Sequence, residues 1–469
     1  MTNFASALAA GDTSLLPEEA LQTWLPEQRW FGSKAQHLAG VSVTDAVLVR
    51  DDAPQLVLAL VQARFSPGTT ELYQVPIGVR PADEGWTEGV IAEAGGSVIY
   101  DAFSDPELAR DIGRLMGESG TLPGDGGNVT FCWTGSERQP IADDTPVRTV
   151  GEEQSNSSVV FGDELIMKSF RKLEAGVNPD LEMLRFLSQH GFQHIAELFG
   201  WYEYEGRLID ATLGILQRFL KGAENGWRLA LDELESAPDS FLDKLGALGR
   251  VTGEMHTVLG SDASDPAFSP DEPSAEALSL LTATVDEQIE RVFVELPEDP
   301  RLAEIAGRGQ DVREQLQALS QVGVGGRVIR THGDYHLGQT MWCTDATWMI
   351  VDFEGEPARP LPERRVKRSP LRDVAGMLRS FAYVASAAGI QRGVSVPDDW
   401  EDRARRVFLD AYVETVDPSL LPPSDEATQK LLAMFELEKA VYELRYELNN
   451  RPDWVGIPAA GIARLLEAE

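Results

Sequence analysis

Thr331-His332-Gly333-Asp334-Tyr335-His336-Leu337-Gly338-Gln339-Thr340 is the stretch of this chain that carries most of its chemistry. A short apolar run, Val328 and Ile329, precedes it. A second apolar run, Trp348 to Val351, follows it and ends at Asp352. Short apolar runs bounded by polar residues are typical of buried strands. The pattern therefore predicts an acid and a carboxamide on a loop, with another acid at the end of the next strand.

Asp334, Gln339 and Asp352 form the set of side chains that phosphoryl transfer from ATP requires. Asp334 is predicted to hold and deprotonate the attacking hydroxyl group, because positioning matters more than basicity in this reaction. The side-chain oxygens of Gln339 and Asp352 are predicted to bind Mg²⁺, which prefers oxygen ligands. The sequence therefore predicts a small-molecule kinase that uses ATP and Mg²⁺.

The two histidines of this stretch, His332 and His336, are predicted to be structural. A histidine in a tight loop often braces the backbone through a hydrogen bond and takes no part in proton transfer. A zinc site is disfavoured, because no third and fourth ligands follow at a suitable spacing.

A second group of candidate residues lies in the first half of the chain. A polar segment precedes two strand-like pieces, Val159 to Phe161 and Leu165 to Phe170, and is interpreted as a turn that folds over the phosphates of ATP. Lys168 on the second piece is expected to contact the α- and β-phosphates, and Glu182 on the following helix to hold it through an ion pair. The predicted ATP-binding residues are Ser155, Asn156, Ser157, Ser158, Lys168 and Glu182. Alone, such a group is more often a turn and a surface ion pair; the set around Asp334 favours the functional interpretation.

The bulk composition excludes several classes of protein. The chain has 469 residues, of which 43% are hydrophobic and 25% charged, and its net charge is −35. Such acidity argues against a nucleic-acid or anionic-membrane partner, and is typical of a solvated surface or, less often, of attraction for a cationic substrate. The only cysteines, Cys132 and Cys343, show no metal-ligand spacing and fit a reduced compartment. With no signal-peptide pattern and no apolar run of about 20 residues, a cytoplasmic location is expected.

A chain of this length predicts two or three subdomains. Residues 1–95 are interpreted as an N-terminal cap subdomain with a small antiparallel sheet and a helix. Residues 96–217 are predicted to be the nucleotide-binding N-lobe, and residues 218–469 a mainly helical C-lobe with the catalytic loop and the acceptor site. The oligomeric state, the role of the cap and the extent of lobe closure stay open.

The catalytic stretch resembles that of aminoglycoside-phosphotransferase-like kinases, with Gln339 where most of that superfamily has Asn. Further matches to bacterial maltokinases are spread over nearly the whole chain. These matches are Trp24-Leu25-Pro26, Arg29-Trp30, Gln154-Ser155-Asn156, Asn178-Pro179-Asp180, Asp352-Phe353-Glu354-Gly355-Glu356-Pro357, Ser369-Pro370-Leu371-Arg372-Asp373 and Lys439-Ala440-Val441-Tyr442-Glu443. The resemblance implies an α+β, bilobal, protein-kinase-like fold with an N-terminal cap, a mainly helical C-lobe, ATP, Mg²⁺ and a sugar acceptor.

The C-terminal tail departs from the maltokinase pattern. Maltokinases typically have His where this chain has Asn450, and Gly where it has Asp453. Trp454 is expected to stack on a pyranose ring, and the acids near it to pair with a positively charged amino group. The predicted substrate-binding residues, which share one helix face or follow it, are Glu443, Tyr446, Glu447, Asn450, Asp453 and Trp454. A solvated turn is the alternative interpretation of Asp453.

The tail resembles that of the maltokinase-related actinobacterial glucosamine kinases more than that of maltokinases. This resemblance implies a kinase that converts glucosamine to glucosamine 6-phosphate, although the sequence leaves open which hydroxyl reacts. A maltokinase that makes maltose 1-phosphate is the nearest alternative. An aminoglycoside phosphotransferase is a third, and a non-catalytic pseudokinase a fourth, which is disfavoured because Asp334, Lys168 and Asp352 are all present.

Overall fold

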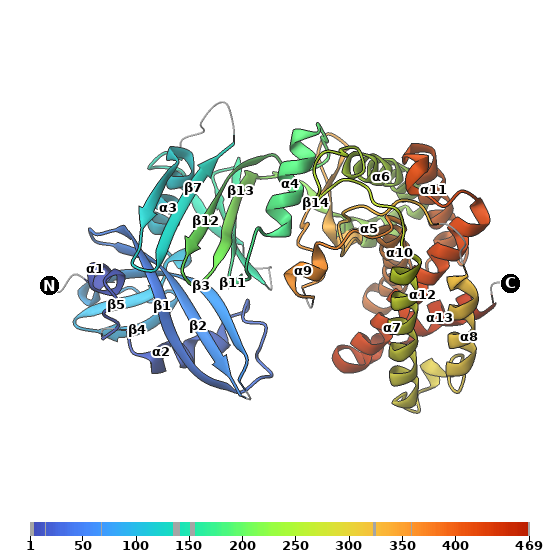
Figure 1. The fold of residues 1–469 in the computed structure, drawn as a ribbon, viewed down its shortest axis with the longest axis horizontal. Helices are drawn as coiled ribbons and strands as arrows, with labels where there is room; N and C mark the ends of the chain where they lie inside the picture. Colours follow the sequence, from blue (N-terminus) through green and yellow to red (C-terminus); the bar gives the residue numbers. More distant parts are fainter. Residues whose placement is uncertain are drawn as a thin grey trace. The chain divides into compact units, whose positions relative to one another are not determined.

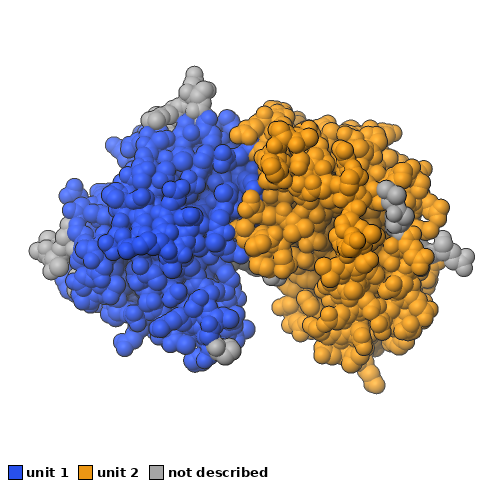
Figure 2. Space-filling view, in the orientation of Figure 1, with its two compact units in different colours: residues 1–185, 196–221 blue, residues 186–195, 222–469 orange. Residues whose placement is uncertain are grey.

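The computed structural model of the protein describes residues 4–14, 16–66, 68–134, 141–150, 155–321, 325–357 and 359–467. The chain divides into two compact units, which Figure 1 shows as a ribbon and Figure 2 colours separately. Unit 1 comprises Met1–Arg185 and Ala196–Lys221, and unit 2 comprises Phe186–Ile195 and Gly222–Glu469. The predicted start of the C-lobe at residue 218 lies close to the start of the long segment of unit 2. The predicted division of the first part at residue 95 stays a prediction.

The first sheet of unit 1 is antiparallel, with strand order β1-β2-β3-β5-β4 and β11 paired to β3. Its strands are β1 (Leu38–Arg50), β2 (Gln55–Phe65), β3 (Thr70–Pro81), β4 (Val90–Ala94), β5 (Ser97–Asp101) and β11 (Lys172–Leu173). Residues 56–61 of β2 are all buried, because this central strand is covered on both faces. One face packs on Trp24 and Trp30, whose ring centroids lie 5.8 Å apart. The tryptophans are therefore part of a core.

The second sheet of unit 1 is also antiparallel and has the order β6-β7-β12-β13-β10-β9-β8. Its strands are β6 (Gly120–Pro123), β7 (Gly127–Trp133), β8 (Val147–Val150), β9 (Asn156–Phe161), β10 (Leu165–Phe170), β12 (Leu198–Gly206) and β13 (Asp210–Arg218). Buried Gln74 of β3 joins the two sheets, since its Nε2 donates to Ser169 Oγ (3.0 Å), Phe170 O (3.1 Å) and Leu213 O (2.9 Å). A buried amide with three acceptors fixes the register of one sheet against the other.

The prediction of a polar turn at residues 155–158 is wrong for three of its four residues. Asn156, Ser157 and Ser158 lie in β9, where Asn156 pairs with Phe170 and Ser158 with Lys168. Their backbone groups take part in the sheet, so they do not form a separate turn over a ligand. The first half of β9 was missed because its residues are polar. Only its second half, Val159 to Phe161, has the apolar pattern that predicts a strand.

Several helices complete unit 1. They are α1 (Phe4–Ala9), α2 (Glu18–Trp24), η1 (Leu25–Glu27), η2 (Ala82–Glu84), η3 (Ala102–Ser104), α3 (Pro106–Glu118) and α4 (Pro179–Gln189), the last few residues of which belong to unit 2. Asp105 caps α3 by accepting from Glu107 N, and Pro106 occupies its first position. The apolar face of α3 packs on the second sheet through Leu108, Ile112 and Met116.

Unit 2 is mainly helical, as predicted. Its helices are α5 (Gly226–Ser236), α6 (Pro238–Leu259), α7 (Ala275–Val294), η4 (Pro300–Leu302), α8 (Gly309–Ser320), η5 (Leu337–Gln339), α9 (Leu361–Arg364), α10 (Leu371–Arg392), α11 (Trp400–Thr415), η6 (Pro418–Leu420), α12 (Asp425–Asn450), η7 (Pro452–Trp454) and α13 (Gly456–Glu467). Helix α10 is apolar almost all round and buried, and it ends at Gly393 in the left-handed conformation (φ 68°). No helix of the residues described is both long and apolar enough to cross a membrane.

A small antiparallel sheet carries the catalytic stretch of unit 2. Its strands are β14 (Glu224–Asn225), β15 (Thr340–Trp342) and β16 (Trp348–Ile350), in that order. The apolar run Val328 and Ile329 forms only isolated bridges, to Asp271 and Arg368. The run after the catalytic loop is therefore a true strand, whereas the run before it is a braced loop segment.

Candidate active site

One buried carboxylate of helix α10 anchors the catalytic loop of unit 2 through hydrogen bonds. Asp373 accepts hydrogen bonds from His332 N (2.7 Å) and Gly333 N (3.0 Å), and His256 Nε2 lies 3.2 Å from it. Burial acts to raise the pKa of Asp373, but the bonds from His256 and the loop amides outweigh it, and the pKa is lowered. Asp373 therefore stays ionised and fixes the start of the loop.

His332 joins the catalytic loop to the segment after β16. Its Nε2 lies 3.0 Å from Val351 O, and its Nδ1 lies 3.4 Å from Asp334 N. A carbonyl only accepts, so Nε2 carries the proton and Nδ1 accepts from the amide of Asp334. The ring also packs on Tyr335 and Phe353, at centroid distances of 5.2 and 4.9 Å. This is the geometry that the predicted bracing role requires.

Gln339 and Asp352, the two predicted metal ligands, lie side by side. Gln339 Nε2 donates to Asp352 Oδ2 at 3.0 Å, and Val351 N donates to Gln339 O at 3.0 Å. Asp352 has a φ of 66°, a strained conformation for a residue other than glycine, which is typical of functional sites. A backbone turned in this way directs the carboxylate away from the strand course of β16.

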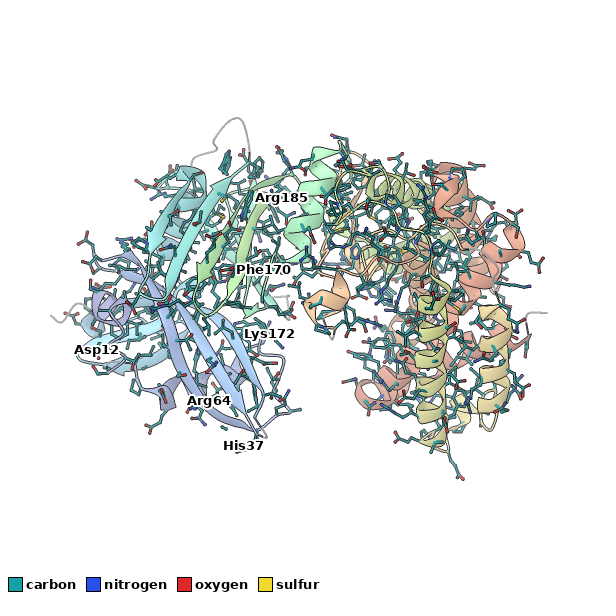
Figure 3. All side chains as sticks on the ribbon, in the orientation of Figure 1. Asp12, His37, Arg64, Phe170, Lys172 and Arg185 are labelled. Carbon is teal, nitrogen blue, oxygen red and sulfur yellow. The ribbon has the colours of Figure 1, made fainter. Side chains whose placement is uncertain are left out.

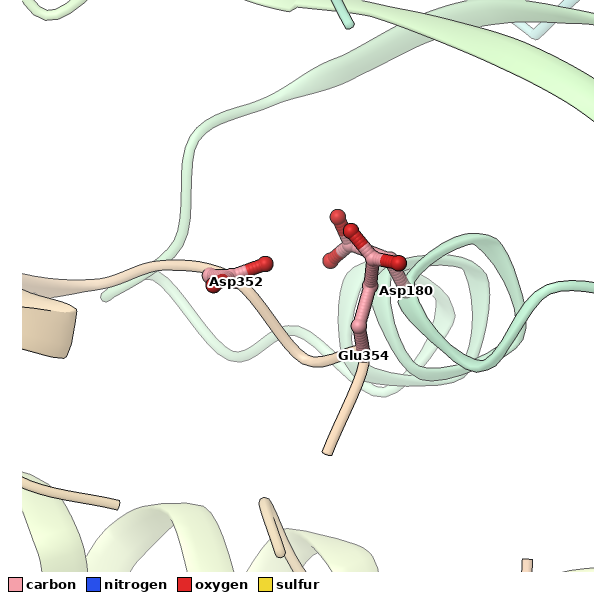
Figure 4. A group of neighbouring side chains, drawn as sticks. All are labelled: Asp180, Asp352 and Glu354. Carbon is pink, nitrogen blue, oxygen red and sulfur yellow. The ribbon is translucent and has the colours of Figure 1, made fainter. Parts of the chain in front are cut away.

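Glu354 is a further acid of this segment that the sequence analysis did not assign to metal. Carboxylate oxygens of Asp352 and Glu354 lie within 4.8 Å of one another on the loop after β16 (Figure 4). The two carboxylates and the amide oxygen of Gln339 make an all-oxygen donor set, which fits Mg²⁺. The available signal was a second acid only two residues after the predicted ligand Asp352.

Asp334 lines a small cavity of unit 2, about 50 Å³ in volume. The other charged residues of its wall are Glu356, Arg359, Arg372, Asp373, Glu438 and Lys439. Lys439 Nζ lies 3.5 Å from Asp334 Oδ1. Burial acts to lower the pKa of Lys439, but nearby carboxylates, of which Asp334 has the largest effect, outweigh burial and raise the pKa. We name this space the acceptor cavity.

His336 lies beside the acceptor cavity. Its Nε2 is 4.0 Å from Asp334 Oδ2, beyond hydrogen-bond reach, and its Nδ1 accepts from Gly338 N at 3.0 Å. Burial lowers its pKa, so the ring is neutral near pH 7. The ring shapes the loop as a structural residue would.

Lys168 of unit 1 is held by an acid that the sequence analysis did not choose. Lys168 Nζ lies 3.0 Å from Asp180 Oδ2, and both side chains are almost fully buried. Asp180 lies in the first turn of α4, where Asn178 Oδ1 accepts from its N–H at 2.8 Å (Figure 4). Lys168 also lies 5.7 Å from the ring of Phe170, which Figure 3 labels. The ion pair predicted between Lys168 and Glu182 stays a prediction.

The four predicted phosphate-covering residues have separate surroundings. Ser155 is exposed just before β9, whereas Asn156 and Ser158 are buried. Ser157 Oγ accepts from Arg171 Nε at 2.7 Å. Gln154, one of the residues on which the family resemblance rests, lies outside the described residues.

Glu443 and Glu447, the two acids predicted on the tail helix to bind the sugar, each form an ion pair with an arginine of the protein. Glu443 Oε2 accepts from Arg379 Nε at 3.0 Å, and Glu447 accepts from Arg451 Nε (2.9 Å) and Nη2 (2.6 Å). Tyr383 Oη also donates to Glu447 at 3.2 Å. Burial raises the pKa of Glu443 and outweighs the effect of Arg379. Both carboxylates therefore already have positive partners within the fold.

The other tail residues lie nearer the surface. Tyr446 and Asn450 are exposed, and the Asn450 side chain donates to Tyr446 O in its own helix at 2.8 Å. The Asp453 side chain is 94% exposed and lies 3.3 Å from Arg301. Trp454 stacks on Tyr383 at 6.3 Å. None of the six tail residues lines the acceptor cavity around Asp334, so the structure does not bring the two predicted groups together there.

Comparison with known proteins agrees with this arrangement. Residues 24–105 match the maltokinase N-terminal cap domain, and residues 146–355 match the phosphotransferase enzyme family. A glucosamine kinase from Streptacidiphilus jiangxiensis is 27% identical over 403 residues, which cover 83% of this chain and 87% of that protein. A glucosamine kinase from Mycolicibacterium smegmatis is 27% identical over 335 residues, covering 68% of this chain and 79% of the relative.

A solved structure confirms the fold prediction. It is a glucosamine kinase in complex with glucosamine, ADP and inorganic phosphate, with a TM-score of 0.71, 20% identity, and coverage of 99% of this chain and 100% of the other. Two family matches in the predicted order and a fold shared over the whole length point to one conclusion. The chain has a region similar to the maltokinase N-terminal cap domain at residues 24–105, a region similar to the phosphotransferase enzyme family at residues 146–355, and over its whole length the fold of a glucosamine kinase.

Proposed function

We propose that the protein transfers the γ-phosphoryl group of ATP to glucosamine and forms glucosamine 6-phosphate. The observation that carries the proposal is the placement of Asp334 on the wall of the acceptor cavity, on the braced loop that leads to Gln339, whose side chain donates a hydrogen bond to Asp352. The choice of glucosamine is supported by the two curated relatives named for this activity.

Asp334 acts as the base of the reaction. Its carboxylate accepts a hydrogen bond from the acceptor hydroxyl and takes its proton as the oxygen attacks the γ-phosphorus. The bond between the γ-phosphorus and the bridging oxygen breaks, and ADP leaves with that oxygen. Lys439 Nζ, 3.5 Å from Asp334, orients the carboxylate and balances its charge until the acceptor enters.

Asp352, Glu354 and Gln339 would hold Mg²⁺. Bound there, the ion neutralises negative charge on the β- and γ-phosphates. Lys168 contributes a positive charge to the α- and β-phosphates, with Asp180 and the predicted partner Glu182 holding its side chain. Ser155 and the start of β9 complete the nucleotide site. A cytoplasmic location, where ATP is supplied, belongs to the same proposal.

Recognition of the sugar is proposed for the tail. Trp454, whose ring contacts Tyr383 and the guanidinium of Arg451, is the proposed stacking partner of a pyranose ring. Asp453 is largely exposed and pairs with Arg301 through Oδ1, so its other carboxylate oxygen is the proposed partner of an ammonium group. Glu443 and Glu447 were predicted to bind the sugar. Because they pair with Arg379 and Arg451, we assign them the role of positioning the tail.

The second candidate is a maltokinase, which the match of the cap domain supports. The two candidate functions share the same chemistry and differ only in the acceptor sugar. Maltose carries no positive charge that could pair with the acids of the tail. The acceptor panel described next also tests two further alternatives, an aminoglycoside kinase and a non-catalytic protein.

The test is a panel of acceptors assayed for ADP release with the full chain. Glucosamine, maltose, kanamycin and no acceptor are compared, each with Mg²⁺ and with excess EDTA. We expect Mg²⁺-dependent release of ADP with glucosamine and at least tenfold lower kcat/KM with maltose. Preferential turnover of maltose or kanamycin would overturn the amino-sugar assignment, and no acceptor-dependent release would overturn the kinase assignment.

A further inference from the structure

Unit 2 contains a second cavity, of about 710 Å³, beyond the acceptor cavity. Its wall is made by the first turns of α7, the segment 366–369 that leads into α10, and Leu431 of α12. Arg372 and Phe435 line both this cavity and the acceptor cavity. A ligand here would therefore share two side chains with the acceptor site.

The charges on the wall of this second cavity do not balance. Four charged residues line it, namely Asp286, Lys367, Arg368 and Arg372. Asp286 accepts two bonds from Arg313, at 2.8 and 2.7 Å. Lys367 pairs with Asp271 at 3.0 Å, and Arg372 with Glu438 at 2.5 Å. Arg368 is left without a carboxylate within ion-pair distance among the residues that the structure describes.

Arg368 is fixed in place by its backbone. Arg368 N donates to Ile329 O at 2.8 Å, and Ile329 N donates to Arg368 O at 2.9 Å. Burial, and then the positive charges of Arg372 and Arg359, lower the pKa of Arg368 to about 10. An arginine whose charge is disfavoured by burial and by neighbouring positive charges gains a favourable interaction when an anion binds beside it.

Two helix N-termini add to the positive potential of the second cavity. Ser274 caps α7, and Ser369 lies just before α10; both residues line the wall. Each helix has at least 20 residues, and its N-terminal end carries a partial positive charge. Leu278, Leu281 and Val366 supply apolar surface beside these charges. The site therefore combines an anion-binding corner with a wall that fits a compact organic body.

We propose that the second cavity binds a small organic anion, a carboxylate or phosphomonoester on a body of about sugar size, through Arg368. Occupancy changes the affinity for the acceptor through the shared residues Arg372 and Phe435. The binding part stands on its own; the effect on the acceptor rests on the proposed kinase activity.

Calorimetry tests the binding part. The full chain is saturated with ADP and Mg²⁺, so that the nucleotide site is filled, and titrated with benzoate and with glucose 6-phosphate. These probes distinguish a carboxylate on an apolar body from a phosphomonoester on a sugar body. We expect saturable binding of at least one probe, weakened at least tenfold in Arg368→Gln. Arg327→Gln is the matched control, since Arg327 pairs with Glu272 at 3.3 Å and does not line the cavity.

Leu278→Trp provides an independent variant, because its larger side chain narrows the cavity beside Arg368 while leaving Arg368 intact. It should also weaken binding at least tenfold. Absence of saturable binding to the wild type, or binding with wild-type affinity by Arg368→Gln or by Leu278→Trp, would overturn the proposal.

The regulatory part is tested by the KM for glucosamine with and without the bound probe. We expect the KM to change at least threefold in the wild type and not in Arg368→Gln, whose kcat without probe stays at the wild-type value. An unchanged KM at saturating probe would overturn this part. If no sugar is phosphorylated but Arg368-dependent binding is measured, the kinase proposal fails while the anion site stands.

Discussion

Asp373 is the residue on which the geometry of the catalytic loop most depends. It binds two loop amides and His256 while fully buried, so its removal leaves several polar groups without partners. We predict that Asp373→Asn lowers the free energy of unfolding by about 3–5 kcal/mol at pH 7. Urea unfolding of the variant and the wild type measures the difference.

The effect of Asp373→Asn should depend on pH in a defined direction. The pKa of Asp373 is lowered below 3.8 in the folded protein, so the unfolded state binds more protons in that range. The stabilisation is present above about pH 3.8 and is lost as the pH falls through the folded pKa. The difference between variant and wild type should be constant from pH 7 to pH 5 and shrink below pH 3.8. A variant as stable as the wild type at pH 7 would contradict the anchoring role.

At this scale the sequence predicts residue types better than partners. Gln339 and Asp352 lie side by side, as two predicted ligands of one ion must, because a short pair of strands joins them. Their roles, and that of Asp334, stay predictions. Asp180 was missed, because it and Glu182 share the first turn of α4, where side chains point in different directions and spacing alone does not choose between them.

The next scale is that of the secondary-structure elements, where helix α10 and the catalytic loop touch at Gly376. A Cβ atom at this position would lie 2.6 Å from Tyr335 O, closer than van der Waals contact allows. Gly376→Ala is therefore predicted to displace the loop that carries Asp334, lowering kcat at least tenfold and stability by about 1–3 kcal/mol. Gly389→Ala, in the same helix with its nearest contact at 3.7 Å, is the control and should change neither. Wild-type kcat in Gly376→Ala would show that the loop tolerates the shift.

The tail of helix α12 separates structural from recognition roles. Glu443→Gln removes the charge that faces buried Arg379 and is predicted to cost about 3–5 kcal/mol of stability. Asp453→Gly removes an exposed side chain, so stability should stay within about 0.5 kcal/mol while kcat/KM for glucosamine falls at least tenfold. Thermal unfolding and kinetics of both variants check this. An unchanged kcat/KM in Asp453→Gly would remove Asp453 from the sugar site.

The sequence could not reveal which acids of α12 are already paired. Glu443, Tyr446, Glu447 and Asn450 follow helical spacing, but Glu443 and Glu447 are buried while Tyr446 and Asn450 are exposed. The burial of an acid depends on distant partners such as Arg379 on α10, and those contacts are invisible in a local pattern. The strand β9 was missed at Asn156–Ser158 for a related reason, since its neighbours β8 and β10 impose the extended conformation.

For the whole molecule, net charge sets how substrates approach. With a charge of −35, the protein attracts a cationic amino sugar over distances of about one Debye length, about 10 Å at 0.1 M salt and about 3 Å at 1 M. We predict that the KM for glucosamine rises at least twofold between 0.05 and 0.5 M KCl, while the KM for neutral glucose stays constant. Parallel salt dependence for both sugars would show that surface charge plays no part.

The fold as a whole was predicted correctly because the motifs that resemble a known kinase family are spread over nearly the whole chain. The cap sheet, the lysine-bearing strand and the catalytic loop follow one another in an order that few architectures share. The acceptor cavity and the second cavity, in contrast, arise where α7, α10 and α12 come together, and no stretch of sequence marks them.

The most direct test of the account is the kcat of Asp334→Asn with ATP, Mg²⁺ and glucosamine. Loss of the base should lower kcat about 10²–10⁴-fold, with little change in KM or in stability. Asp345→Asn, an exposed acid in the turn between β15 and β16, is the matched control and should keep the wild-type rate. A wild-type rate in Asp334→Asn would contradict the assignment of phosphoryl transfer to this loop.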